Sequence, residues 1–196
     1  MSIGIDLGTT HCVVAYSDGN EVSVLPLAQL VAEGEVAARE LLPSFIFLAE
    51  TPFAGEYARK LGAQAPTKLV HSAKSWICHG GINRRAPILP WAAEGAAHVS
   101  PFDAQVMLLQ HMRAAWERAH PARPISQEDV VVTVPASFDE GARELTLDAA
   151  REAGMAHASL LEEPQAAFYH YVAAETLAAE TLAAETLKDE KLLLVV

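Results

Sequence analysis

The first 25 positions of the chain alternate between apolar and polar or small residues, a pattern typical of β-strands. Residues 3–7 form the first strand of this kind, residues 12–16 are an apolar run, and residues 21–25 alternate again. Asp18-Gly19 between the last two segments is a strong hairpin signal. The pattern therefore predicts that the chain opens with antiparallel strands joined by tight turns.

The segment at residues 35–99 has a less regular pattern. A short strand is expected at residues 45–48, and helices are expected at residues 56–61 and 66–78. Prolines and a pair of adjacent glycines interrupt the rest of the segment. This pattern predicts a smaller subdomain inserted into the connectivity of a main sheet.

Strand and helix patterns alternate from residue 100 onward. Ser100-Pro101 provides an N-cap and a first-turn proline for a helix that is expected to end near Ala119. The later elements are expected as a strand at residues 129–134, a helix at 139–153 that ends at Gly154, a short strand at 158–161 and a helix from Gln165. Strand–helix units after an antiparallel opening predict an α/β fold with a mixed five-stranded sheet flanked by helices.

A short repeat follows, because residues 173–187 are three copies of Ala-Ala-Glu-Thr-Leu. A period of five does not place the three leucines on one side of a helix, so no coiled-coil seam is expected. Alanine, glutamate and leucine still favour helix, and an exposed helical extension of about 22 Å is predicted. A docking arm for a partner remains an alternative for this segment.

The composition limits the class, the partners and the location of the protein. The 196 residues are 51% apolar and 20% charged, which is typical of globular proteins and excludes fibrous and disordered classes. A formal net charge of -11 disfavours binding to nucleic acids. No apolar stretch approaches the ~18 residues needed to cross a bilayer. Only two cysteines and no export-signal pattern occur, so a cytoplasmic protein is expected.

The strongest chemical signal is the turn after the first strand. Asp6 ends the strand, and Gly8, Thr9 and Thr10 follow it. Such a turn offers backbone N–H groups and hydroxyls to phosphate oxygens, and the carboxylate can hold a hydrated magnesium ion. A simple hairpin turn without a ligand is the alternative.

Two later blocks support the phosphate interpretation, and with them the chain resembles the DnaK family of heat-shock chaperones, in the actin-like ATPase superfamily. The three blocks are Asp-Leu-Gly-Thr-Thr at residues 6–10, Val-Thr-Val-Pro-Ala at 132–136 followed by Phe138 and Arg143, and Glu163-Pro164 followed by an alanine-rich helix. The resemblance is clear for residues 1–25 and 126–172 and weaker between them. It implies a ribonuclease H-like lobe.

The resemblance also implies the site residues. It makes Gly8, Thr9, Thr10 and His11 the first phosphate-binding loop, with Asp6 near a magnesium ion that it holds through water. It implies that Lys74 and Glu163 are catalytic, the lysine at the transferred phosphate and the glutamate near the attacking water. Pro135 and Arg143 match residues that relay the nucleotide state to a peptide-binding domain.

Several positions depart from the family pattern. His11-Cys12 replaces Asn-Ser, Ser137 replaces a tyrosine and Glu162 replaces an asparagine. Residues 40–44 keep only the Pro-Ser end of an Arg-Thr-Thr-Pro-Ser stretch. These differences indicate a divergent branch of the family.

The resemblance implies an N-terminal piece of an ATP-binding domain. Residues 1–34 and 100–172 would form the main sheet subdomain, residues 35–99 the insert, and residues 173–196 a helix and the start of a strand that leads to a second lobe. The cofactors would be ATP or ADP and Mg²⁺, and the partners would be unfolded client proteins and co-chaperones. The chain alone is expected to be inactive, because the second phosphate loop is not in it. A non-catalytic interaction module and a sugar-kinase-like phosphotransferase are the alternatives.

Overall fold

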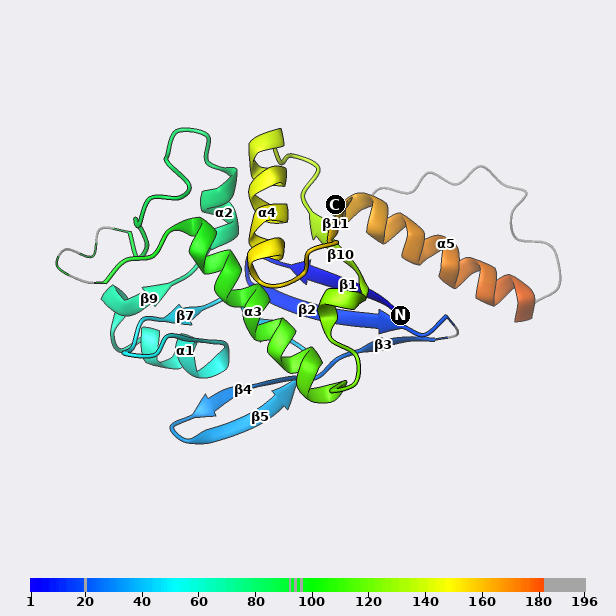
Figure 1. Cartoon of the computed structure of the whole chain (residues 1–196), viewed down its shortest axis with the longest axis horizontal. Helices are drawn as coiled ribbons and strands as arrows, with labels where there is room; N and C mark the ends of the chain where they lie inside the picture. Colours follow the sequence, from blue (N-terminus) through cyan, green and yellow to red (C-terminus); the bar gives the residue numbers. More distant parts are fainter. Residues whose placement is uncertain (20, 92, 94, 96, 182–196) are drawn as a thin grey trace.

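A mixed sheet lies at the centre of the protein, whose computed structural model describes residues 1–19, 21–91, 93, 95 and 97–181 (Figure 1). The strand order is β11-β10-β1-β2-β3, and the two-residue strand β6 also pairs with β2. The strands are β1 (Ser2–Leu7), β2 (His11–Ser17), β3 (Val22–Val24), β6 (Leu42–Pro43), β10 (Asp129–Val134) and β11 (Ser159–Glu162). Strands β1, β10 and β11 are parallel, while β2 and β3 are antiparallel to their neighbours. The predicted mixed α/β sheet is confirmed, but it has six strands and not five, because the two-residue strand β6 was not predicted.

The alternation along β1 decides which face of the sheet is buried. Ile3 and Ile5 are each 1% exposed, and Leu7 is 2% exposed. They belong to the same core as Val132 of β10 and Trp116 of α3 (Pro101–Ala119). Helices α3 and α4 (Glu140–Glu152) lie across this face of the sheet (Figure 1).

The ends of these two helices follow from their capping residues. Ser100 and Asp103 form a complete capping box at the start of α3. The carboxylate of Asp139 accepts a hydrogen bond from the backbone N–H of Ala142 at the start of α4. Gly154 has a φ of 92° just after the end of α4, a conformation that glycine adopts without strain. The helices predicted from residue 100 and from residue 139 are therefore confirmed.

Residues 27–78 build short elements on the side of the sheet. They are β4 (Leu27–Ala32), β5 (Glu35–Arg39), β7 (Ile46–Phe47), β8 (Phe53–Ala54), α1 (Glu56–Gly62), the 3-10 helix η1 (Pro66–Lys68), β9 (Leu69–Val70) and α2 (Ala73–Cys78). The β4–β5 hairpin was not predicted, and its turn contains the boundary that we expected between residues 34 and 35. A second 3-10 helix, η2 (Ile125–Gln127), precedes β10.

The single helix predicted for residues 66–78 is wrong. Leu69 and Val70 leave the helical conformation and pair with Phe47 and Ile46 of β7. Ser72 then adopts a left-handed φ of 55° before α2 begins. Pairing with a distant strand outweighs the local helical preference of this segment.

Helix α5 (Glu163–Thr181) extends away from the sheet (Figure 1). It begins two residues before the predicted start, and it includes the first part of the Ala-Ala-Glu-Thr-Leu repeat. The remainder of the repeat and the predicted strand at residues 192–196 lie outside the described residues. Within the described part of the chain, no helix has the length and apolar character needed to cross a bilayer.

Candidate functional site

A cavity of about 670 Å³ lies at the carboxyl ends of β1 and β10. Its lining residues come from β1, from the loop after β10 and from the start of α5: Asp6, Thr133, Pro135, Ala136, Ser137, Glu163, Pro164, Ala166 and Ala167. The carboxyl ends of parallel strands are the usual place for ligand sites in open α/β sheets. The cavity therefore brings together two segments that are more than 100 positions apart in the sequence.

The turn between β1 and β2 leaves no room for a side chain at its first position. A Cβ atom on Gly8 would overlap the carbonyl oxygen of His11. Only glycine fits here without a shift of the backbone. Residues 8–11 are not among the residues that line the cavity, which Asp6 reaches from the preceding strand. The structure thus places Gly8, Thr9, Thr10 and His11 in one tight turn next to Asp6.

Ser44 holds this turn from behind, and the sequence analysis missed it. Its hydroxyl donates to the Gly8 carbonyl at 2.7 Å, and its backbone N–H donates to the Thr10 carbonyl at 2.8 Å. Ser44 is 5% exposed, so both hydrogen bonds are shielded from water. The retained Pro43-Ser44 part of an otherwise divergent stretch was the available signal.

Asp6 is one of the residues that line the cavity. Its Oδ1 accepts a hydrogen bond of 2.9 Å from the hydroxyl of Thr133 on the neighbouring strand. Among the described residues, no group of three or more histidine, cysteine, aspartate and glutamate side chains could hold a metal ion by itself. A site with one or two carboxylates fits magnesium, which keeps several waters and binds phosphate oxygens.

Lys74 and Glu163 form an ion pair beside the cavity. The Nζ atom of Lys74 lies 2.5 Å from Oε1 of Glu163, although the residues are 89 positions apart. The lysine side chain is 7% exposed and the glutamate side chain 42%. A nearly buried ammonium group needs such a partner, because removing it from water is costly. Glu163 also lines the cavity with Asp6, so the structure brings all three predicted side chains to one region.

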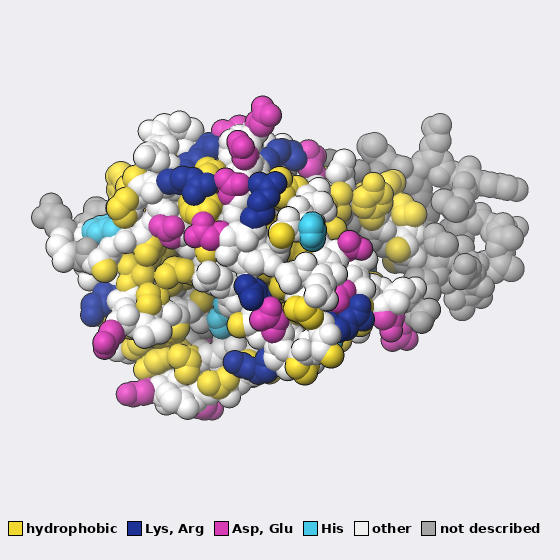
Figure 2. Space-filling model, in the orientation of Figure 1, with side chains coloured by type: hydrophobic (Ala, Val, Ile, Leu, Met, Phe, Trp, Pro, Cys, Tyr) yellow, Lys and Arg dark blue, Asp and Glu magenta, His cyan; other side chains and the backbone are white. Residues whose placement is uncertain are grey.

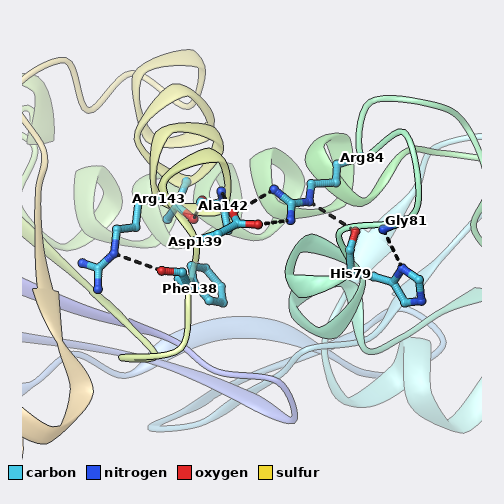
Figure 3. Close-up of polar contacts among 8 residues, drawn as sticks. His79, Gly81, Arg84, Phe138, Asp139, Ala142 and Arg143 are labelled. Carbon is cyan, nitrogen blue, oxygen red and sulfur yellow. Dashed lines mark hydrogen bonds and ion pairs between the residues drawn. The ribbon is translucent and has the colours of Figure 1, made fainter.

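Arg143 connects the loop after β10 to the end of β11. Its Nη2 donates to Oε1 of Glu162 at 2.6 Å. Its Nε donates to the carbonyl of Phe138 at 3.3 Å (Figure 3). Glu162 is one of the departures from the family pattern, and here it supplies the partner of the arginine. Pro135 lies in the same loop and lines the cavity. Pro135 therefore shares the cavity with Glu163, and Arg143 is paired with the residue before Glu163.

Cys12 is buried under the phosphate-loop candidate. It is 0% exposed, and its Sγ lies 3.3 Å from the hydroxyl oxygen of Ser44. Burial raises the pKa of the Cys12 thiol to about 11, so the thiol is neutral at pH 7. It acts as a small core residue.

A family model and known chaperone proteins match this chain. A model described as "Hsp70 protein" matches residues 2–181. The chain is 35% identical over 185 residues to "Chaperone protein HscA" of Serratia proteamaculans (strain 568). It is 33% identical to the protein of the same name from Pectobacterium carotovorum subsp. carotovorum (strain PC1) and to "Chaperone protein HscA homolog" of Pseudomonas aeruginosa (strain LESB58). Each match covers 87% of this chain and 28% of the relative, so the chain spans little more than a quarter of their length.

Proposed function

Because the chain belongs to the Hsp70 family, we propose that the cavity at the ends of β1 and β10 binds the phosphates of ATP or ADP with a magnesium ion. Membership of this family removes the sugar-kinase alternative. The cavity, the tight turn and the nearby carboxylates support a phosphate site rather than a ligand-free hairpin.

The observation that carries the proposal is the meeting of Asp6, Lys74 and Glu163. These residues come from three distant segments of the chain. Lys74 and Glu163 form an ion pair, and Asp6 and Glu163 line the same cavity. Phosphoryl transfer needs a metal anchor, a cation and a group that orients the attacking water around one point. These three side chains supply those three parts.

Each residue then has a separate role. The backbone N–H groups and hydroxyls of residues 8–11 cradle phosphate oxygens, and Asp6 holds the waters of the magnesium ion. Magnesium, when bound, offsets the negative charge of the phosphates. Lys74 stabilises the charge that develops on the transferred phosphate, and Glu163 orients the attacking water.

The proposal extends to the longer protein of which this chain would be the first lobe. The relatives are named chaperones, and the chain spans 28% of their length. A second phosphate loop, an adenosine pocket and a peptide-binding domain would come from sequence beyond this chain. We propose that the full-length protein is a cytoplasmic chaperone that couples ATP hydrolysis to the binding of unfolded clients, with Pro135 and Arg143 as relay residues.

Calorimetric titration of ATP with magnesium into the full-length protein tests the nucleotide site. We expect saturable binding, and we expect the Kd to rise by about tenfold or more in Asp6→Asn, because the carboxylate anchors the hydrated metal. Glu35→Gln, an exposed glutamate on β5, is the control and should leave the Kd unchanged. Absence of binding in the full-length protein would favour the non-catalytic interaction module and overturn the proposal.

A further inference from the structure

Arg84 and Asp139 form a two-point ion pair outside the candidate site. Nη1 of Arg84 lies 3.0 Å from Oδ1 of Asp139, and Nη2 lies 2.7 Å from Oδ2 (Figure 3). The arginine side chain is 12% exposed, and the aspartate side chain is 56% exposed. Two parallel hydrogen bonds between a guanidinium and a carboxylate fix both distance and orientation. This pair therefore joins two segments that are 55 positions apart with a defined geometry.

Each partner also holds the end of a helix. Nε of Arg84 donates to the carbonyl of His79, the residue that follows α2, at 3.4 Å. Oδ1 of Asp139 accepts from the N–H of Ala142 at 2.6 Å and so caps α4. The guanidinium of Arg84 lowers the pKa of the Asp139 carboxyl, and both groups stay charged at pH 7. The pair thus links the C-terminal end of α2 to the N-terminal end of α4.

The short helix α2 depends on such links for its position. It has six residues, too few to be stable without tertiary contacts. Ile77 is fully buried in a small cluster with Val134, Phe138 and Ala142. Lys74 lies three positions before Ile77, on the same side of the helix. A contact that fixes the end of α2 therefore also fixes the position of the Lys74 ammonium group, which pairs with Glu163.

We infer that Arg84 and Asp139 are positioning residues for Lys74: they hold α2 against the loop that follows β10, so that the lysine reaches the candidate phosphate site. This inference rests on the proposed function of that site. It also connects Lys74 with the segment that contains Pro135 and Arg143, because Asp139 lies between those two residues.

A neighbouring ion pair provides a matched control. Arg85 lies 2.8 Å from Asp148 on the exposed side of α4, and the two side chains are 49% and 37% exposed. Figure 2 shows that basic and acidic side chains gather over α4. The two pairs differ in the arginine, because Arg84 is 12% exposed and Arg85 is 49% exposed. They also differ in geometry: Arg85 and Asp148 share one hydrogen bond, and among the described residues this pair makes no bond to the end of α2.

The first test compares Asp139→Asn with Asp148→Asn in the full-length protein. Asparagine keeps the helix cap but removes the charge that orients Arg84. We expect Asp139→Asn to lower the kcat of phosphate release by about tenfold with a nucleotide Kd within about twofold of wild type, because a displaced lysine affects chemistry more than binding. Asp148→Asn should change neither value. Equal losses in both variants would overturn the inference.

The second test asks whether the effect passes through Lys74. In a Lys74→Ala background, Asp139→Asn should cause no further loss of rate, since the residue that it positions is already absent. A further tenfold loss in that background would show that the pair acts on another group.

Hydrogen exchange keeps the inference testable without catalysis. Amides of α2 should exchange about fivefold faster or more in Asp139→Asn than in wild type, and Asp148→Asn should match wild type. Unchanged exchange in Asp139→Asn would overturn the inference. A wild-type protein that releases no phosphate would refute the proposed function, while hydrogen exchange would still decide whether the pair holds α2.

Discussion

The central sheet and most of the segment at residues 35–99, which we predicted to be an insert and call the insert below, keep their shape in different ways. Strands β1 and β10 have six residues each and bury alternate side chains against two long helices. In the insert, β7 and β9 have two residues each and are held by pairing with distant segments. The candidate site nevertheless takes Asp6 from the sheet and Lys74 from the insert. The geometry of the candidate site therefore depends on how firmly the insert is attached to the sheet.

The largest effect is expected for substitutions of aromatic core residues, which should lower the free energy of unfolding more in the sheet region than in the insert. Trp116 is 0% exposed and contacts the rings of Tyr16 and His120, so Trp116→Ala should lower the free energy of unfolding by about 3–5 kcal/mol. Phe53 of the insert is only partly buried, and Phe53→Ala should cost about 1–2 kcal/mol. Urea unfolding of the 196-residue chain measures both values. A larger loss for Phe53→Ala would reverse the comparison.

The second-largest effect is expected at the contact between Ser44 of the insert and Gly8 of the phosphate-loop candidate. Ser44→Ala leaves the Gly8 carbonyl without its hydroxyl donor, which should lower the free energy of unfolding by about 1–3 kcal/mol and weaken nucleotide binding. Ser137→Ala, an exposed serine that lines the cavity, should change stability by less than about 0.5 kcal/mol. Urea unfolding and nucleotide titration provide the measurements. Equal effects of the two substitutions would contradict the claim that Ser44 holds the turn at Gly8.

The pH dependence of the free energy of unfolding should also distinguish the two regions, and its effect is expected to be smaller. Arg123 and the N-terminal amine lower the pKa of Glu128, whose side chain is 6% exposed beside the sheet. A lowered pKa in the folded state stabilises the protein above the unfolded pKa of about 4.3, and this contribution disappears as the pH falls through the folded pKa. The free energy of unfolding of Glu128→Gln should therefore lie below that of wild type at pH 7 and approach it in acid.

Glu56 of the insert is the matched comparison for that experiment. Lys60 lowers its pKa as well, but the Glu56 side chain is 23% exposed. Glu56→Gln should shift the pH profile of stability less than Glu128→Gln, because water screens the exposed pair. Thermal unfolding between pH 3 and pH 7 would show the two profiles, and identical profiles would contradict the difference in burial.

The smallest effect is a difference between the two cysteines. Cys12 of the sheet is buried, and Cys78 of the insert is exposed. One thiol should react with a neutral disulfide reagent in the native 196-residue chain, and two should react in denaturant, because the Cys12 thiol is shielded. Rapid reaction of both thiols in the native chain would show that the sheet opens at the candidate site.

The sequence predicted most of the sheet because its signals are local. Ser100-Pro101 and Gly154 define helix ends through contacts within a few residues, and β1 follows from strict alternation. The β4–β5 hairpin was missed, although Gly34 with a φ of 70° marks its turn. Strand β9 could not be predicted, because two residues carry no periodicity and depend on a partner strand.

The candidate site likewise combines a local signal with contacts between distant segments. The turn at Gly8 has a local motif, whereas Lys74 and Glu163 were proposed only from the family resemblance. Ser44 contacts Gly8 across 36 positions, and Arg84 contacts Asp139 across 55. No spacing in the sequence encodes such contacts, so only the folded arrangement reveals them.

Phosphate release by the full-length protein carrying Lys74→Ala tests most directly whether the insert completes the site on the sheet. The account predicts that kcat falls by at least about 100-fold while the nucleotide Kd stays within about threefold of wild type, because the ammonium group stabilises charge in the transition state. Lys68→Ala, an exposed lysine of the insert, is the control and should keep wild-type values. Wild-type turnover by Lys74→Ala would contradict the claim that sheet and insert form one site.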